Sequence, residues 1–360
     1  MHLTVANLPH FLIGRGLLGA ERVVAGDVVV IDASRRNRNF KVISSGGGLF
    51  VKQMRDLQAD AMLTLRREAS CYELARSDEA LAGVMPKLVA YDPIRHLLVV
   101  ELAPDAESLA EFHQRCGALP PALGETLGEA VGLYHQRATA IIENEAMQTL
   151  FARQPPVILT LGRGGHAVLG QFGHIGPALS AIIQQHPEFQ RLLDALGDEW
   201  RFDSLIHGDM KWDNILVFPA TAPTPNFRIV DWEMADVGDA AWDVGAVLQS
   251  FLAAWILSMP LSSGLPPERY VSLATQPLEA MLPVIHAFWN AYSRQRGFTA
   301  EEKPREIERC LRFGAARLVW TAVEQRLYTY NLDPTVSAFL QVSLNILQDP
   351  KRAVSELLRV

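Results

Sequence analysis

At 360 residues the chain is longer than a single hydrophobic core usually supports, so its length favours two domains. Its formal charge of −7 argues against nucleic acid as a main partner, because phosphate backbones attract clustered Lys and Arg. The three cysteines are scattered and form no CxxC pair, which indicates neither a zinc site nor a disulfide framework and favours the reducing cytoplasm.

The opening stretch, MHLTVANLPHFLIGRGLL, lacks a basic segment followed by a long apolar run, so it is not typical of a secretory signal. Farther along, three short runs rich in β-branched and aromatic residues occupy positions 28–32, 39–43 and 49–54. A polar turn at 33–38 and a flexible, Gly-rich segment at 44–48 separate these runs. This order predicts a three-stranded antiparallel meander.

Residues 58–76 show helical periodicity, and two more strands fit residues 87–91 and 97–102. Five strands with one helix form a small α+β lobe. We therefore predict two domains, a nucleotide-binding N-lobe over residues 1–103 and a mainly helical C-lobe over residues 104–360 that carries the catalytic, metal and acceptor sites.

The second half of the chain is dominated by helical patterns, and a Gly-rich stretch at residues 161–166 is expected to form a loop. The uncharged run Val244–Leu265 approaches the length of a transmembrane helix, but polar residues interrupt it and Pro260 breaks its far end. We interpret this run as a buried core helix and expect no membrane association. The predicted helices cover residues 107–116, 121–139, 180–196, 240–258, 277–295, 303–328 and 335–358.

The segment LIHGDMKWDNILV, residues 205–217, has the spacing of a kinase catalytic loop. In it Asp209 is followed five residues later by Asn214 and then by an apolar strand, which is the pattern H-x-D-x-x-x-x-N. Phosphoryl transfer needs a carboxylate beside the incoming hydroxyl, and a neutral oxygen ligand that completes the metal shell. Asp209 suits the first task and Asn214 suits the second.

A second acidic motif, FRIVDWE, follows at residues 227–233. An Asp at the end of an apolar strand can present its carboxylate to the Mg²⁺ that bridges the β- and γ-phosphates, so Asp231 would correspond to the Asp of the D-F-G element. Each motif alone is a modest signal. Together, in this order and on compatible strands, they predict a kinase.

The two segments HGDMKWDNILV and IVDWEMADVGDAAWDVG resemble the aminoglycoside phosphotransferase and choline kinase family, and the resemblance covers most of the chain. It implies a bilobal, protein-kinase-like α+β fold that binds ATP between a small antiparallel-sheet N-lobe and a mainly helical C-lobe. It also implies that Asp209 is the catalytic base and that Asn214 and Asp231 hold Mg²⁺. Asp243 would be a buried acid that braces the catalytic loop, and His207 would pack beneath Asp209.

Lys52, on the third predicted strand, is the only Lys in its region that could reach the α- and β-phosphates of ATP. Its expected ion-pair partner is Glu68 on the following helix, and Glu73 is the competing choice. The end of the fifth strand contains the expected hinge, whose backbone groups would meet the adenine. The hinge residues are Glu101, Leu102 and Ala103.

The phosphate loop departs from that of protein kinases, because the first turn reads SRRNRN and contains no G-x-G-x-x-G. Small-molecule kinases of the family commonly lack these glycines too. Backbone N–H groups of Ser34 and Asn37 could still bind phosphate, and Arg35, Arg36 or Arg38 could add charge. An exposed basic turn is the alternative interpretation.

Lys211, two residues after Asp209, is similar to the Lys of protein Ser/Thr kinases that steadies the transferring phosphate, so we predict that it is catalytic rather than a surface charge. Trp212 could line the acceptor pocket. Four acidic residues near the motifs could hold a cationic acceptor, or could be helix caps and loop charges. They are Asp213, Glu233, Asp236 and Asp239.

Three functions remain open from the sequence. The first is ATP- and Mg²⁺-dependent transfer of the γ-phosphate to a hydroxyl of a small molecule, such as an aminoglycoside, an amino alcohol or a sugar. The second is a peptide Ser/Thr kinase of lanthipeptide-like ribosomal-peptide modification that works with a separate lyase, because Lys211 and the N-terminal segment look similar to such proteins. The third, a non-catalytic pseudokinase, is disfavoured because the expected Lys, Asp and metal ligands are all present. The acceptor, the choice between ATP and GTP, and the oligomeric state cannot be read from the sequence.

Overall fold

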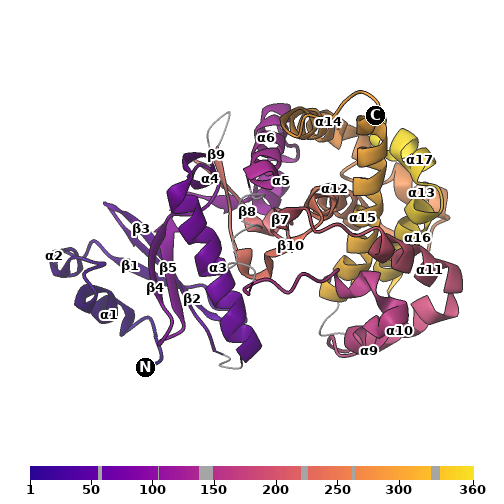
Figure 1. The fold of residues 1–360 in the computed structure, drawn as a ribbon. Coiled ribbons are helices and arrows are strands. Elements are labelled where there is room, and N and C mark those ends of the chain that lie inside the picture. The colour runs from indigo at the N-terminus through magenta and orange to yellow at the C-terminus, as the bar shows by residue number, and fades with distance from the viewer. Residues whose placement is uncertain (56–58, 104, 138–148, 220–225, 262–263, 326–332) are drawn as a thin grey trace. The chain divides into compact units, whose positions relative to one another are not determined.

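The computed structural model describes residues 1–360 except 56–58, 104, 138–148, 220–225, 262–263 and 326–332 (Figure 1). Its residues group into two compact units. The first unit consists of Met1–Leu109 and Asn214–Ala235, and the second consists of Ala110–Asp213 and Asp236–Val360. The chain thus returns to the first unit for the segment that contains Asp231. The division into lobes over 1–103 and 104–360 stays a prediction, and residue 104 lies outside the described residues.

A five-stranded antiparallel sheet with strand order β1-β2-β3-β5-β4 forms the centre of the first unit (Figure 1). The predicted meander and the two later strands are confirmed. The segment predicted to be flexible is mostly strand instead, because β2 extends through Ser44 and β3 begins at Gly47, where a φ of 127° suits glycine. The strands are β1 Val29–Asp32, β2 Arg38–Ser44, β3 Gly47–Gln53, β4 Leu88–Asp92 and β5 Leu97–Leu102.

The two faces of this sheet are covered differently, since successive side chains of a strand point to opposite faces. On one face Phe40, Val51 and Val99 are buried with Leu8 and other residues of the N-terminal segment. That segment carries α1 (Leu8–Gly14) and α2 (Ala20–Val24), for which the sequence pattern predicted no element. On the other face lies α3 (Ala59–Ser77), close to the predicted helix 58–76 (Figure 1). Lys52 points toward this face, because its Nζ atom meets Glu68 of α3.

A smaller sheet completes the first unit, with strand order β6-β8-β9. Its strands β8 (Ile215–Phe218) and β9 (Asn226–Ile229) pair antiparallel, and the Val230 N–H donates to the Asn214 carbonyl at 2.9 Å. Residues that precede β8 and follow β9 therefore lie at the same end of this hairpin. The remaining elements of the first unit are α4 Glu79–Ala82, β6 Glu107–Ser108 and the 3₁₀ turn η4 Trp232–Met234.

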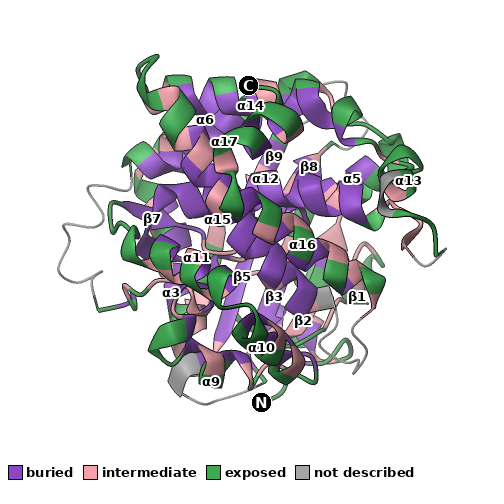
Figure 2. Ribbon diagram, turned by 90° about the vertical axis from the view of Figure 1, so that its right-hand side faces the viewer, coloured by how far each residue is buried: buried purple, intermediate pink, exposed green. Residues whose placement is uncertain are grey.

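The core of the second unit is α12 (Ala240–Leu257) packed against α15 (Glu302–Gln325), and both helices are largely buried (Figure 2). Among the described residues α12 is the one helix long and apolar enough to span a membrane, but 89% of its apolar window is buried, as in a core helix. Where the two helices cross, a Cβ on Gly245 would lie 2.7 Å from the Gly314 N atom. Only glycine permits this backbone-to-backbone approach.

Two helices predicted from periodicity are each divided by a proline. The single helix expected over 180–196 is two helices that meet at Pro187, and the one expected over 335–358 is interrupted at Pro350. Proline breaks a helix interior because it has no N–H for the ladder and its ring clashes with the preceding turn.

The Gly-rich stretch 161–166, predicted to be a loop, forms a 3₁₀ turn, a left-handed residue at Gly164 with a φ of 97°, and the start of α9 (Gly165–Leu169). The chain packs closely there, since a Cβ on Gly165 would lie 2.6 Å from the Thr160 carbonyl oxygen. The ends of two predicted helices, residues 138–139 and 326–328, lie outside the described residues. The other elements are α5 Leu109–Cys116, α6 Pro121–Arg137, η1 Val157–Leu159, η2 Leu161–Arg163, α9 Gly165–Leu169, α10 Gly176–Gln185, α11 Pro187–Asp198, β7 Ser204–Ile206, η3 Trp212–Asn214, β10 Asp236–Gly238, α13 Pro267–Ser272, α14 Leu278–Gln295, α16 Pro334–Gln348, α17 Pro350–Ala353 and a π-helical turn Val354–Leu358.

Candidate active site

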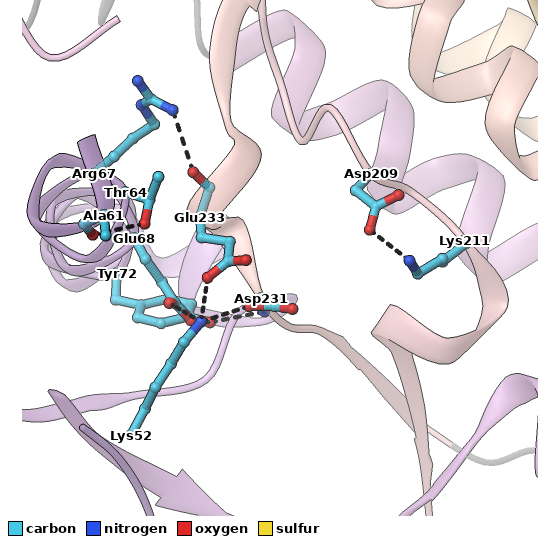
Figure 3. A network of polar contacts seen from close by, with 10 residues as sticks. All are labelled: Lys52, Ala61, Thr64, Arg67, Glu68, Tyr72, Asp209, Lys211, Asp231 and Glu233. Carbon is cyan, nitrogen blue, oxygen red and sulfur yellow. Dashed lines mark hydrogen bonds and ion pairs between the residues drawn. The ribbon is translucent and has the colours of Figure 1, made fainter. Parts of the chain in front are cut away.

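Lys52 on β3 is the centre of a cluster of carboxylates in the first unit (Figure 3). Its Nζ atom lies 2.8 Å from Glu68 Oε2, 2.7 Å from Asp231 Oδ1 and 2.8 Å from Glu233 Oε2. Glu68 comes from α3, whereas the other two follow β9. The structure thus pairs Lys52 with Glu68 and not with Glu73, which is exposed and pairs with Arg76.

Hydrogen bonds to neighbouring groups hold the Glu68 carboxylate and the backbone of Asp231 and Glu233 in place. The Tyr72 hydroxyl donates to Glu68 Oε1 at 3.0 Å and accepts from the Asp231 N–H at 3.1 Å, so one side chain ties α3 to the chain that follows β9. Arg67 donates to the Glu233 carbonyl at 3.2 Å. Asp231 itself has a φ of 66°, which is uncommon for a residue with a Cβ and typical of functional turns.

The cluster carries more negative than positive charge, because three carboxylates surround one ammonium. Burial alone would lower the pKa of Lys52, but Glu68, Asp231 and Glu233 outweigh burial and hold that pKa well above its ordinary value. Burial raises the pKa of Glu68 to about 7, and the two neighbouring carboxylates act in the same direction while Lys52 opposes them. A further cation would therefore stabilise this cluster electrostatically.

The same carboxylates have the chemistry of a magnesium site. Ligand oxygens of Glu68, Asp231 and Glu233 lie within 4.8 Å of one another, and carboxylate oxygen is the donor that Mg²⁺ prefers. Asn214, predicted as the second ligand, is buried and lies at the same end of the β8–β9 hairpin as Asp231. The first unit thus collects the predicted ligands, whose role in metal binding stays a prediction.

Asp209 lies in the second unit, in the loop between β7 and η3. The buried carboxylate of Asp243 anchors this loop by accepting the His207 N–H at 2.6 Å and the Gly208 N–H at 3.0 Å. His207 is fully buried, and its Nδ1 accepts the Asp209 N–H at 3.2 Å. The bracing role of Asp243 and the packing role of His207 are both confirmed. Gly208 has a φ of 80°, which suits glycine at this turn.

The Asp209 carboxylate is held by two cations. Lys211 Nζ lies 2.9 Å from Oδ2 (Figure 3), and Arg317 Nη2 from α15 donates to Oδ1 at 2.9 Å. Burial alone would raise the pKa of Asp209, but Arg317 and then Lys211 outweigh it and hold that pKa well below its ordinary value. Lys211 also lies 3.5 Å from Glu324 Oε1. Both cations therefore favour the ionised form of Asp209.

Hydrogen bonds within the first unit already engage the predicted Ser34 N–H group, the Ser34 hydroxyl and the Asn37 carbonyl. The Ser34 N–H donates to Asp32 Oδ1 at 2.9 Å, and the Ser34 hydroxyl accepts the Asn39 N–H at 3.1 Å. Asn37 is 5% exposed, and its carbonyl accepts the Arg35 N–H at 3.2 Å. These bonds shape the β1–β2 turn, and phosphate binding by Ser34 or Asn37 stays a prediction.

The expected hinge lies at the end of β5. The Glu101 N–H donates to the Lys87 carbonyl at 2.9 Å, and the Ala103 carbonyl accepts the Ala106 N–H at 3.2 Å. Leu102 is buried and pairs with Gly48, where a Cβ would lie 3.0 Å from the Leu102 Cβ. Contact between this segment and adenine stays a prediction.

Three of the four acidic residues proposed to hold a cationic acceptor interact with other groups of the protein. Asp239 caps α12 by accepting the Ala241 N–H at 3.0 Å, and it forms a buried ion pair with Arg309. Asp236 accepts the Arg153 N–H at 3.0 Å. For these two residues the cap and loop interpretation is confirmed. Glu233 lies on Lys52, as described above, and Asp213 is exposed.

Trp212, which could have lined an acceptor pocket, is 5% exposed and packs against neighbouring rings. Its centroid lies 4.9 Å from that of His113 and 4.8 Å from that of Phe251. The residue thus anchors the loop after Asp209 in the core of the second unit.

The sequence did not predict the contact of Glu233 with Lys52 or any role for Arg317. Glu233 had been considered only as a ligand of a cationic acceptor or as a loop charge, although its place two residues after Asp231 in the same motif was a signal for the contact. Arg317 had none, because it lies 108 residues from Asp209 in a helix whose sequence carries no kinase motif.

In this structure a lysine on a strand pairs with a glutamate on a helix, and a separate loop that carries an aspartate is held by a buried carboxylate. These features are typical of a phosphotransferase with a kinase-like fold. Residues 27–265 match the model of the phosphotransferase enzyme family, and the chain belongs to this family. A spectinomycin phosphotransferase, solved with ADP and spectinomycin, is 13% identical with a TM-score of 0.52, over 98% of this chain and 100% of that one. A microcompartment-associated aminopropanol kinase is 15% identical with a TM-score of 0.53, over 92% of this chain and 94% of that one. Similarity at these identities shows the fold alone. No curated protein sequence matches the chain.

Proposed function

We propose that this phosphotransferase moves the γ-phosphate of ATP to a hydroxyl group of a small molecule, with Mg²⁺ as cofactor. The cluster around Lys52 carries this proposal, because its ammonium meets three carboxylates at 2.7–2.8 Å. An ammonium has three N–H donors, so each donor of Lys52 has one carboxylate. The arrangement suits a site that receives polyphosphate and a divalent cation together.

Nucleotide binding would redistribute these bonds. The Lys52 ammonium would keep Glu68 and exchange Asp231 and Glu233 for oxygens of the α- and β-phosphates. Asp231 and Glu233, with Asn214, would then serve as oxygen ligands of Mg²⁺, whose charge bridges and neutralises the phosphates. Because the exchange leaves two carboxylates without their cation unless metal is present, ATP and Mg²⁺ should bind cooperatively.

The acceptor hydroxyl would be oriented by Asp209, whose carboxylate is ionised and held by Lys211 and Arg317. Phosphoryl transfer depends mainly on positioning and electrostatic stabilisation, so a carboxylate of low basicity can still serve. Related folds include a spectinomycin phosphotransferase and an aminopropanol kinase, and we propose an aminoglycoside, amino alcohol or sugar as the acceptor. The contact of Lys211 with Asp209 keeps a peptide Ser or Thr as the second candidate. The free cysteines suit the reducing cytoplasm.

Calorimetric titration tests the nucleotide half of this proposal. Wild-type protein should bind ATP more tightly with Mg²⁺ than without it, and the melting temperature should rise because the ligand binds only the folded state. Asp231→Ala should remove most of the gain in ATP affinity, and most of the rise in melting temperature, that depends on Mg²⁺. Glu73→Ala, on the exposed side of α3, is the matched control and should behave as wild type. If ATP produces neither heat nor a melting shift, with or without Mg²⁺, the proposed function is wrong.

A screen for ADP release tests the acceptor half. The panel contains spectinomycin and other aminoglycosides, aminopropanol, sugars and Ser- or Thr-containing peptides, each at saturating ATP and Mg²⁺. Asp209→Asn provides the blank. Release that depends on a small molecule and disappears in Asp209→Asn supports the proposal, whereas release that depends on a peptide alone favours the second candidate.

A further inference from the structure

Arg317 is a buried cation in the middle of α15, a helix that lies beyond the residues 27–265 matched by the family model. Its side chain is 4% exposed, and its Nη2 atom donates to Asp209 Oδ1 at 2.9 Å. We propose that Arg317 is a positioning residue, which fixes the orientation of the Asp209 carboxylate so that this group receives the acceptor hydroxyl. This inference rests on the proposed function.

Stability alone gives little reason for an arginine at this position. Its neighbours Ala316, Leu318 and Val319 on α15 are fully buried and apolar. The Arg317 Nε atom is also buried, and it has no hydrogen-bond partner in the described part of the chain. A buried charge with an unpaired donor usually destabilises a fold relative to an apolar residue. The guanidinium packs over the Trp242 ring at 5.4 Å, which offsets part of this cost.

A second buried arginine on the same helix shows the contrasting, structural arrangement. Arg309, about two turns earlier, donates from Nη1 to Asp239 Oδ1 at 2.8 Å and from Nη2 to Oδ2, and it also reaches the Glu199 carbonyl at 3.4 Å. Both terminal nitrogens of the Arg309 guanidinium thus donate to a single carboxylate, that of Asp239, which caps α12. Arg317, in contrast, gives Asp209 a single bond to one oxygen and leaves the other oxygen to Lys211.

This division of the carboxylate between two cations has a chemical consequence. Arg317 on Oδ1 and Lys211 on Oδ2 hold the carboxylate by both of its oxygens and so oppose its rotation. Lys211 alone would hold the group loosely, because its side chain is 31% exposed and shared with Glu324. Arg317 is therefore the more rigid of the two supports.

The charge on Asp209 depends on the same support. Among the described residues, the charged and titratable groups that face it include Lys211 and His207 from its own loop, and Arg317 and Glu324 from α15. Removing Arg317 would take the buried cation away from this carboxylate and leave the partly exposed ammonium of Lys211. Since burial favours the neutral acid, the pKa of Asp209 should then rise.

Three full-length variants test the inference. Arg317→Met removes the positive charge, and Arg317→Lys keeps it on a compact ammonium group. Arg309→Met is the control, because it breaks the ion pair with Asp239. We expect Arg317→Met to lower kcat on the order of 100-fold, as for a small misplacement of a catalytic group, with the ATP affinity nearly unchanged. The acid limb of its pH–rate profile should move up by at least about one pH unit. Arg317→Lys should recover part of both effects, and Arg309→Met should lower the melting temperature without moving the acid limb.

The inference is overturned if the lower kcat of Arg317→Met is fully explained by a smaller fraction of folded protein and the acid limb of its pH–rate profile does not move. If Arg317→Met does not fold, Arg317→Lys decides, since wild-type kcat in that variant also overturns it. If wild-type protein transfers phosphate to no acceptor, the proposed function has failed, and the carboxylate itself is measured instead. The ¹³C signal of Asp209, assigned by its loss in Asp209→Asn, should then titrate at higher pH in Arg317→Met or Arg317→Lys than in wild type. An unchanged midpoint overturns the positioning role independently of activity.

Discussion

Replacement of Asp243 by asparagine should destabilise the second unit strongly, because this carboxylate anchors the loop that carries Asp209. It is 0% exposed, and its two oxygens accept the N–H groups of His207 and Gly208 separately. Tyr134 also donates to it. An amide offers one oxygen only, so the side chain introduced by Asp243→Asn would turn an N–H₂ group toward one of the two backbone donors.

The magnitude follows from the groups left without partners. One buried backbone N–H and one buried amide N–H₂ would face each other, and each unsatisfied donor costs about 1–3 kcal/mol, which makes about 4 kcal/mol together. For a unit of this size the melting temperature should fall by about 10 °C. Thermal unfolding followed by circular dichroism measures the shift. Asp198→Asn, which removes one partner of an exposed pair with Arg163, is the control and should change little.

The stability lost in Asp243→Asn should also depend on pH. Burial would raise the pKa of Asp243, but its hydrogen bonds and the neighbouring His135 hold that pKa below the ordinary value. A carboxylate whose pKa is lower in the folded state stabilises the fold above its unfolded pKa of about 4, and this contribution disappears as the pH falls through the folded value. The difference between wild type and Asp243→Asn should therefore stay constant from neutral to mildly acidic pH and shrink only below about pH 4. Equal melting temperatures at neutral pH would refute the anchoring role.

Two further predictions concern the loop itself. Asp209→Asn should lower kcat on the order of 100-fold or more and leave the ATP affinity within a few-fold of wild type. Steady-state rates measure the first quantity and calorimetry the second. A small change in kcat would show that the reacting hydroxyl lies elsewhere. Lys211→Ala should lower kcat and leave the acceptor KM nearly unchanged if the ammonium stabilises the transferring phosphate. If Lys211 instead belongs to the acceptor site, the variant should bind amino sugars more tightly and peptides more weakly, and acceptor titrations at saturating ATP distinguish the two.

Most of the first unit could be predicted from the sequence, because its strands are short, alternate regularly and are separated by clear turns. The motifs also predicted that Lys52, Glu68 and Asp231 act together, since the strand and helix positions leave few partners. The N-terminal helices α1 and α2 could not be predicted in this way. They are too short for periodicity to identify, and their burial depends on the sheet face that Phe40 and Val51 present.

The second unit shows where local patterns fail. Periodicity continued across Pro187 and Pro350, although proline ends the helix at both places. Glycine at 165 suggested a loop, although its task is to let the chain pass close to Thr160. The contact between Arg317 and Asp209 is set by the packing of α15, and no spacing within either segment specifies it.

The glycine pair at the crossing of α12 and α15 has a consequence for the chemistry of the loop. Gly245 lies two residues after Asp243, which holds the loop backbone, and Gly314 lies three residues before Arg317, which holds the Asp209 carboxylate. A Cβ on Gly314 would come within 2.8 Å of the Gly245 carbonyl oxygen. The absence of two Cβ atoms therefore sets the spacing between the two helices, and with it the distance from the Arg317 guanidinium to the Asp209 carboxylate. The placement of this carboxylate thus depends on close contact between two helix backbones.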